Sequence, residues 1–283
     1  MLKDNEVFKK WIESVHSIFE IFEGRCDAYP LAKRWMNEWF ETEKFTILNE
    51  DSEILNNLKE NFDYSTRTFD IETDMVNKID SHFSEFLKSL TEGENRKSNV
   101  GFAVAPYLFT WNFQRFKIYF KKNKFFSLFT YFEELGNFLK KEKEIIGEFR
   151  NKKLLSNEIN KTEVIQIFKD ISDNLNKLGR GQNEPVGTAK LLHIIAPYYF
   201  PLIDNPIAEA VKLKNRRVSL TALDYHQWMV RLKEWLQPKT EIIRKIEQDY
   251  DSSILKLVDE GFYIMSSINL SLKLEMLGIG LRG

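Results

Sequence analysis

An aspartate, a lysine and a short glycine-containing loop lie close together in the C-terminal half of the chain. Asp204 precedes Asn205 and Pro206, and this order of residues is typical of a helix start. A helix dipole favours a carboxylate at that place, so Asp204 is expected to be held in position and ionised. Such a carboxylate can stabilise a developing positive charge or deprotonate a nucleophile. Lys190 lies in the preceding apolar segment, and its amine could act as a nucleophile only if its pKa were lowered.

The glycine-containing loop could bind a phosphate. Val186 and Gly187 precede a predicted helix over residues 188–196, and the first amides of a helix have no partner inside it. Such amides can donate to an anion, which makes Val186, Gly187 and Thr188 candidate contacts to a nucleic-acid backbone. The basic candidates for further phosphate contacts lie at the end of the next predicted helix or just after it: Lys212, Lys214, Arg216 and Arg217.

A second group of candidates lies near the middle of the chain. Trp111, Asn112 and Arg115 fall on one face of a predicted helix and could line a pocket. His193 is placed near the same site, although a histidine in an apolar helix is more often part of the core. No acidic residue occurs between Gly101 and Phe132, where five lysines and arginines make the one sustained basic patch; most such patches are solvated faces.

These candidates depend on helices, and helices are what the rest of the chain predicts. Only 12 Gly and 7 Pro occur in 283 residues, too few for the many turns of a β-sandwich. Apolar residues recur at helical spacing, which predicts an all-α protein. The expected helices cover residues 5–23, 30–40, 71–90, 104–122, 124–148, 163–178, 188–196, 206–214, 220–236 and 239–258, with one brief helix between 41 and 68.

Polar connectors suggest how the chain divides. We expect an N-terminal helical region over residues 1–98, an aromatic and basic helical pair over 99–155, and a C-terminal helical region over 156–283. The three segments could also form one continuous two-lobed domain. Residues 261–280 are assigned to a helix or an arm.

Composition restricts the class of protein. The formal charge of −1 means that any nucleic-acid site must be local. The single cysteine, an N-terminus without a signal peptide and the lack of a long apolar stretch predict an intracellular, cytoplasmic protein that does not span a membrane. The four histidines are not paired at ligand spacing, so neither a metal nor a cofactor is expected. Hydrolase, NTPase and dinucleotide motifs do not occur.

Residues 178–211 resemble the core of the helix-hairpin-helix DNA glycosylase superfamily. In that family an apolar helix after a Val-Gly turn leads through a loop to a catalytic aspartate at the start of the next helix. Here the turn is Val186-Gly187, the apolar helix carries Leu191 and Leu192, and the aspartate is Asp204. The family hairpin reads Leu-Pro-Gly-Val-Gly where this chain has Asn-Glu-Pro-Val-Gly, and Lys190 lies three residues beyond the last glycine rather than two.

The resemblance implies a two-lobed fold with a helix-hairpin-helix-like C-terminal core, and DNA as the partner. It implies base excision, in which a damaged base is flipped out of the duplex and released, with or without cleavage of the abasic strand. Asp204 and Lys190 would be the catalytic residues. The alternative is a non-catalytic helical scaffold that binds nucleic acid or protein, in which Asp204 only caps a helix. The oligomeric state is left open.

Overall fold

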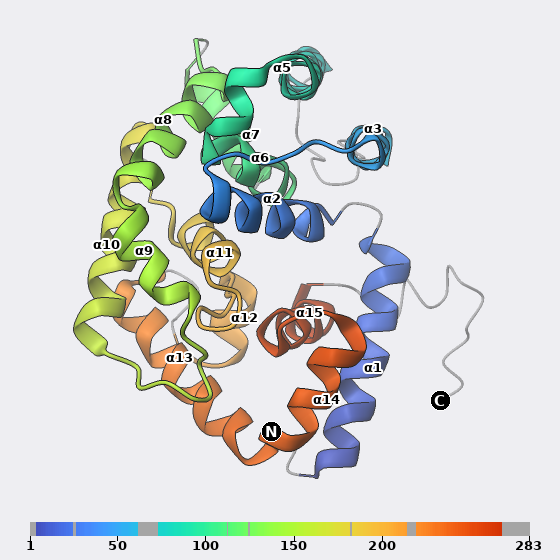
Figure 1. The fold of residues 1–283 in the computed structure, drawn as a ribbon, viewed down its shortest axis with the longest axis vertical. Helices are drawn as coiled ribbons and strands as arrows, with labels where there is room; N and C mark the ends of the chain where they lie inside the picture. The colour runs from blue at the N-terminus through green and yellow to red at the C-terminus, as the bar shows by residue number, and fades with distance from the viewer. Residues whose placement is uncertain are drawn as a thin grey trace.

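The computed structural model describes residues 4–24, 27–61, 73–111, 113–123, 125–181, 183–213 and 219–267. Every regular element within these residues is a helix (Figure 1), which confirms the predicted all-α class. The first half of the chain forms α1 (Asn5–Phe22), α2 (Tyr29–Thr42), α3 (Asn49–Asn61), α5 (Thr73–Glu92), the 3-10 turn η2 (Glu94–Ser98), α6 (Val100–Trp111), α7 (Phe113–Lys122), α8 (Leu128–Lys141) and α9 (Lys143–Arg150). The second half forms α10 (Lys161–Leu178), α11 (Pro185–Ile195), α12 (Asn205–Ala210), α13 (Ala222–Leu236), the 3-10 turn η3 (Gln237–Lys239), α14 (Thr240–Tyr250) and α15 (Ile254–Ser267).

Two long helices expected from the sequence are interrupted in the structure. The expected helix over 104–122 begins earlier, at Val100, and is described as α6 and α7 on either side of Asn112, which lies outside the described residues. The expected helix over 124–148 is divided into α8 and α9 at Glu142. The expected helix over 239–258 ends at Tyr250, because Asp251 adopts a left-handed backbone conformation with φ 45° and α15 then starts in a new direction. Helical periodicity continues across these breaks, and so periodicity alone cannot locate them.

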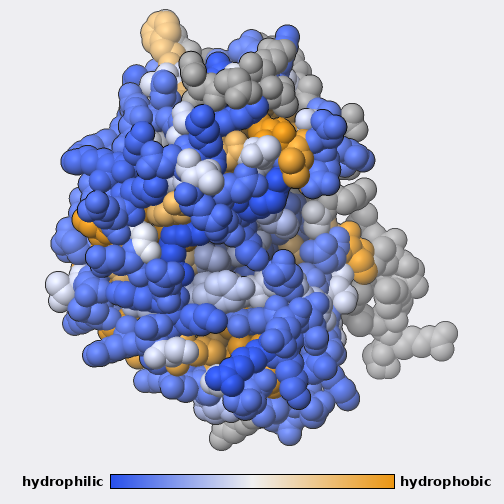
Figure 2. Space-filling model, viewed as in Figure 1, coloured by the Kyte–Doolittle hydropathy of each residue, from blue (hydrophilic) through white to orange (hydrophobic). Residues whose placement is uncertain are grey.

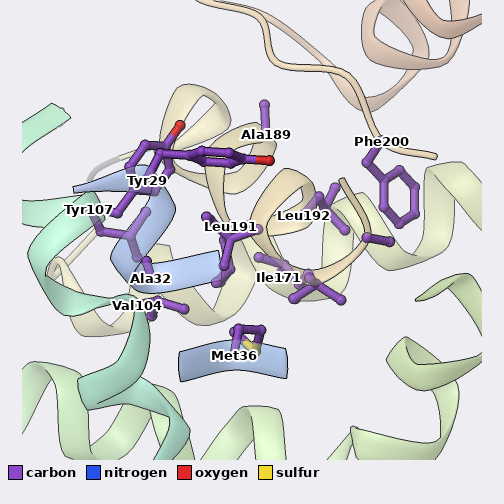
Figure 3. Close-up of a cluster of buried hydrophobic side chains, with 14 of the residues drawn as sticks. Tyr29, Ala32, Met36, Val104, Tyr107, Ile171, Ala189, Leu191, Leu192 and Phe200 are labelled. Atoms are coloured by element: carbon purple, nitrogen blue, oxygen red, sulfur yellow. The ribbon is translucent and has the colours of Figure 1, made fainter. Parts of the chain in front are cut away.

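The helices around α11 build the centre of the molecule. Figure 1 shows α11 enclosed by α2, α6, α9 and α10, and α11 contacts all four. Its residues are apolar almost all round, which is typical of a helix buried on every side. In Figure 3, Tyr29 of α2 and Tyr107 of α6 lie beside Ala189 and Leu191 of α11. α11 thus packs against helices from both the first and the second half of the chain.

The two ends of the described chain meet. α15 packs against α1, α12 and α14, so the first helix and the last described one lie side by side (Figure 1). A Cβ on Gly261 of α15 would lie 2.6 Å from Cη2 of Trp11 on α1, a distance that only glycine allows. The helices of the three expected segments therefore share contacts, and the buried hydrophobic side chains form one cluster drawn from all of them.

Among the described residues, no helix is both long and apolar enough to cross a membrane.

Candidate functional site

The side chain of Lys256 is buried where α15 meets α1 and the start of α2. Lys256 is 4% exposed. Its Nζ lies 3.1 Å from Asp27 Oδ2 and 3.0 Å from Glu260 Oε1. Burial works to lower the pKa of Lys256, but the two carboxylates outweigh that effect and hold the pKa well above its usual range. Lys256 is therefore a buried cation with two buried anionic partners.

Glu260 extends this group to α1. Its Oε2 lies 2.7 Å from Nδ1 of His16, and this hydrogen bond raises the pKa of His16. Burial alone would raise the pKa of Glu260, yet the nearby Lys256 and His16 lower it. The pair thus favours a charged carboxylate beside a protonated imidazole.

Asp27 connects the buried lysine to Lys190. Oδ1 of Asp27 accepts a hydrogen bond from Nε1–H of Trp111 at 3.0 Å and another from the backbone N–H of Tyr29 at 2.9 Å. The backbone carbonyl of Trp111 in turn accepts a hydrogen bond from Nζ of Lys190. A chain of contacts therefore runs from Lys256 through Asp27 and Trp111 to Lys190.

Asp204 lies at the start of α12, as expected. Its side chain caps the helix, with Oδ1 accepting the N–H of Ile207 at 2.8 Å. Burial raises the pKa of Asp204, and the hydrogen bond from Ile207 and the charge of Lys190 offset part of that rise. Lys190 is therefore close enough to Asp204 to lower the pKa of its carboxyl.

The charges of Asp204 and Lys190 also act on the pKa of Asp259. Asp259 lies on α15, which packs against α12. Burial raises the pKa of Asp259 to about 7, and the charge of Asp204 adds to the effect, while Lys256 and Lys190 oppose it. A carboxyl with such a pKa can gain or lose a proton near neutral pH.

The other two described pocket candidates are bound to protein groups. His193 is buried, with Nδ1 2.7 Å from the carbonyl oxygen of Phe200 and its ring stacked on Tyr29 at 5.3 Å between centroids. Burial lowers the pKa of His193 to about 3, which makes it a neutral core histidine. Arg115 forms an ion pair with Glu184, with Nε 2.9 Å from Oε1. Asn112 lies outside the described residues.

The phosphate candidates occupy the first turn of α11 rather than a loop before it. α11 starts at Pro185, so the expected start at residue 188 was too late, because proline at the first helical position already fixes the helical φ. Thr188 is fully buried and its hydroxyl donates to the carbonyl oxygen of Glu184 at 2.7 Å. Gly187 is buried and Val186 half-buried, while Lys212 is exposed after α12. Lys214, Arg216 and Arg217 lie outside the described residues.

Comparisons with known proteins add no family here. The chain matches no family model, no curated protein and no solved structure. Within the described part of the chain, no group of three or more His, Cys, Asp or Glu side chains is arranged to hold a metal ion.

Sequence reasoning missed four members of the site: Asp27, Lys256, Asp259 and Glu260. Each looks like an ordinary surface charge in the sequence. A signal was nevertheless present, because Lys256 and Glu260 are one helical turn apart in a stretch whose other residues include Ile254, Leu255, Leu257 and Val258. Charges one turn apart in so apolar a helix indicate a buried ion pair.

Proposed function

We propose that the protein removes damaged bases from DNA. The observation that carries this proposal is the pKa of Asp259, which burial raises to about 7 and on which the charges of Asp204 and Lys190 both act. Carboxylates whose pKa values are shifted by burial and by nearby charges are typical of sites for acid–base chemistry. Residues 178–211 resemble the glycosylase core, and base excision is the reaction that this resemblance implies for these groups.

In the proposed reaction the bond between the sugar C1′ and the base nitrogen breaks, and the base leaves with the electron pair. Asp204 stabilises the positive charge that develops on the sugar, and it accepts the proton of the attacking water. Protonated Asp259 supplies a proton to the departing base. In the variant of the reaction with strand cleavage, the neutral Lys190 amine replaces water, forms the bond to C1′ and passes a proton to Asp204.

The surface above these helices supports access by a large substrate. Figure 2 shows a recess of paler residues across the middle of the visible face, bordered by strongly hydrophilic residues. In the same view of Figure 1, this region lies between α2 on one side and α12 and α15 on the other. A base turned out of a duplex needs such a recess beside the catalytic groups.

The test uses labelled duplex and single-stranded oligonucleotides that carry 8-oxoguanine, uracil, an alkylated adenine or an abasic site. Asp204→Asn is the decisive variant, because asparagine keeps the helix cap and removes the charge. We expect base release to fall about 100-fold or more in this variant. Borohydride trapping that is lost in Lys190→Gln, but kept in the exposed Lys245→Gln control, would add the strand-cleaving step. Absence of base release from every substrate by the folded wild-type protein would contradict the proposal.

A non-catalytic scaffold is the second candidate, and one specific observation favours it. Oδ1 of Asp204 is used as a helix cap and the Lys190 amine is bonded to the carbonyl of Trp111, so both groups already contribute to the fold. For a scaffold we expect oligonucleotide or protein binding without base release. Asp204→Asn would then leave binding and stability nearly unchanged.

A further inference from the structure

A hollow lies where α14 and the start of α15 meet two connecting segments. It is lined by residues of the segment between α9 and α10, by Tyr198 between α11 and α12, and by residues of both helices. Its volume is about 590 Å³, including space open to solvent, which is within the range of small-molecule sites. In Figure 1 the segment between α9 and α10 runs below α11 and α12 in the view. We call this hollow the α14 pocket.

Hydrogen bonds hold the connecting segment in place beside the pocket. The backbone N–H of Leu154 donates to the carbonyl oxygen of Tyr198 at 2.8 Å. The N–H of Lys153 donates to Oδ1 of Asn157 at 2.7 Å, and the N–H of Ser156 donates to the carbonyl oxygen of Lys153 at 3.1 Å. This wall of the pocket is therefore formed before a ligand arrives, and little backbone entropy is lost on binding.

The inner lining of the pocket is apolar. Leu154, Ile243 and Ile254 line it and are each almost fully buried. Tyr198 lines it as well and is half-buried. Burial raises the pKa of Tyr198, so its hydroxyl keeps the proton and remains a hydrogen-bond donor. An apolar group in the pocket would displace water from these side chains, which favours binding.

The charged groups of the lining are two cations and one carboxylate. The cations are Lys153 and Arg244, and the carboxylate is Glu247. Oε1 of Glu247 accepts the backbone N–H of Ile254 at 2.9 Å, so this carboxylate already serves the junction of α14 and α15. Nζ of Lys153 lies 5.5 Å from the ring centroid of Tyr198. The lining therefore has an excess of one positive charge, which one negative charge on a ligand would balance.

Arg244 can turn toward such a ligand at little cost. Its Nη1 lies 3.1 Å from Oε1 of Glu241, in a pair whose side chains are 68% and 85% exposed. Exposed pairs of this kind contribute little to stability, so Glu241 is a weak competitor for the guanidinium. The guanidinium can donate two parallel hydrogen bonds to a carboxylate, a geometry that selects this group.

We propose that the α14 pocket binds a small organic monocarboxylate, with its apolar body against the buried side chains and its carboxylate toward Lys153 and Arg244. A phosphate monoester suits the pocket less well, because its second negative charge would lie near Glu247 without a partner. An amine of the same shape would meet two cations. The single charge and the apolar body thus define the ligand class.

The α14 pocket is separate from the site of the proposed chemistry. Lys190, Asp204 and Asp259 do not line it. The inference does not rest on base excision, because it concerns the binding of a small acid at other residues. Failure of either proposal would leave the other in place, since one is measured by base release and the other by ligand affinity.

The experiment titrates the full chain with three compounds that share one aromatic body, and follows binding by ligand-observed NMR. Phenylacetate carries the negative charge, phenethyl alcohol is neutral and phenethylamine is positively charged. We expect phenylacetate to bind about tenfold more tightly than the alcohol, and the amine to bind most weakly. Equal affinity for phenylacetate and phenethyl alcohol, or no saturable binding of phenylacetate, would overturn the proposal.

Variants of α14 test the role of the guanidinium. Arg244→Gln is expected to weaken phenylacetate binding about tenfold. Lys245→Gln is the matched control, since it removes the same charge from the next residue, which is exposed and does not line the pocket. Glu241→Gln should strengthen binding about twofold, because it removes the competing carboxylate. An equal loss of affinity in Arg244→Gln and Lys245→Gln would show only a general effect of charge and would overturn the proposal.

Isoleucine methyl signals locate the ligand independently of any variant. In a chain labelled at the isoleucine methyl groups, phenylacetate should shift the signals of Ile243 and Ile254, which line the pocket. The signal of Ile145, which is 53% exposed on α9, should stay in place. Phenylacetate binding that left the Ile243 and Ile254 signals unchanged would place the ligand elsewhere and contradict the assignment.

Discussion

Lys256 carries a charge in the interior, where Asp27 and Glu260 are its carboxylate partners. Removing the amine would leave two carboxylates close together with little water around them. We expect Lys256→Met to lower the free energy of unfolding by about 3–5 kcal/mol, as is usual when one partner of a buried ion pair is removed. Urea denaturation measures this change. Lys245→Met, an exposed change on α14, should stay within about 0.5 kcal/mol of the wild type.

Asp259 makes the stability of the folded protein depend on pH. Its pKa of about 7 in the folded protein lies above the unfolded value of 3.8, so the folded state binds the proton more tightly. The stability contributed by this group is complete below about pH 4 and falls as the pH rises toward 7. Asp259→Asn is therefore expected to be more stable than the wild type at pH 8 and equally stable near pH 4.

Unfolding curves at the two pH values check the Asp259 prediction. Asp249→Asn on the exposed side of α14 serves as the control and should show no such pH-dependent gain. A gain of equal size at pH 4 and pH 8 would show that the Asp259 carboxyl is not the titrating group. An ionisable group that lowers the stability of the folded protein near neutral pH is more typical of a functional site than of a purely structural position.

At the scale of helices, α6 and α8 pack with their backbones in contact. A Cβ on Gly101 would collide with the carbonyl oxygen of Phe132 and would lie 2.7 Å from the backbone nitrogen of Gly136. We expect Gly101→Ala to destabilise the protein by about 1–3 kcal/mol, because the two helices must separate. Gly147→Ala on α9 is the matched control, since its added methyl group meets only a ring carbon of Phe40 at 3.8 Å. That variant should be about 0.5–1 kcal/mol more stable, since alanine favours the helix. Thermal and urea unfolding of both variants provide the comparison, and equal effects would contradict the close contact.

The helices themselves were well predicted where apolar periodicity ended at a sequence signal. α10 ends before Gly179, and α1 begins after the capping Asp4. The break at Asp251 was missed because the left-handed residue at a helix end is usually glycine, and here it is an aspartate. The break at Glu142 was missed because charged residues continue the helical pattern on both sides.

The candidate site was predicted only in its local part. The sequence placed Asp204 at a helix start because capping depends on adjacent residues. Its proximity to Asp259 depends on the packing of α12 against α15, and no local pattern contains that information. The contact between Lys190 and Trp111 likewise joins helices far apart in the chain. Long-range pairs of this kind follow only from the assembled fold.

At the scale of the whole molecule, α1 packs against helices from the opposite end of the described chain. Phe8 of α1 is fully buried and packs edge-on against Trp235 of α13, with ring centroids 5.7 Å apart. Further along α1, His16 forms a hydrogen bond with Glu260 of α15. A single buried cluster therefore joins elements from the whole described chain, and we expect it to unfold in one cooperative step.

Phe8→Ala tests that cooperativity. Loss of a buried ring should lower the free energy of unfolding by about 3–5 kcal/mol, and the urea midpoint should fall equally by far-UV circular dichroism and by tryptophan fluorescence. The tryptophans suit this test because they lie in α1, α2, α6 and α13. Val7→Ala, at a neighbouring site that is 49% exposed, should leave both midpoints unchanged. A variant that lost helix signal early while the fluorescence midpoint stayed at the wild-type value would instead show that α1 unfolds by itself. In that case the charged group around Lys256 would be opened to water without unfolding the rest of the chain.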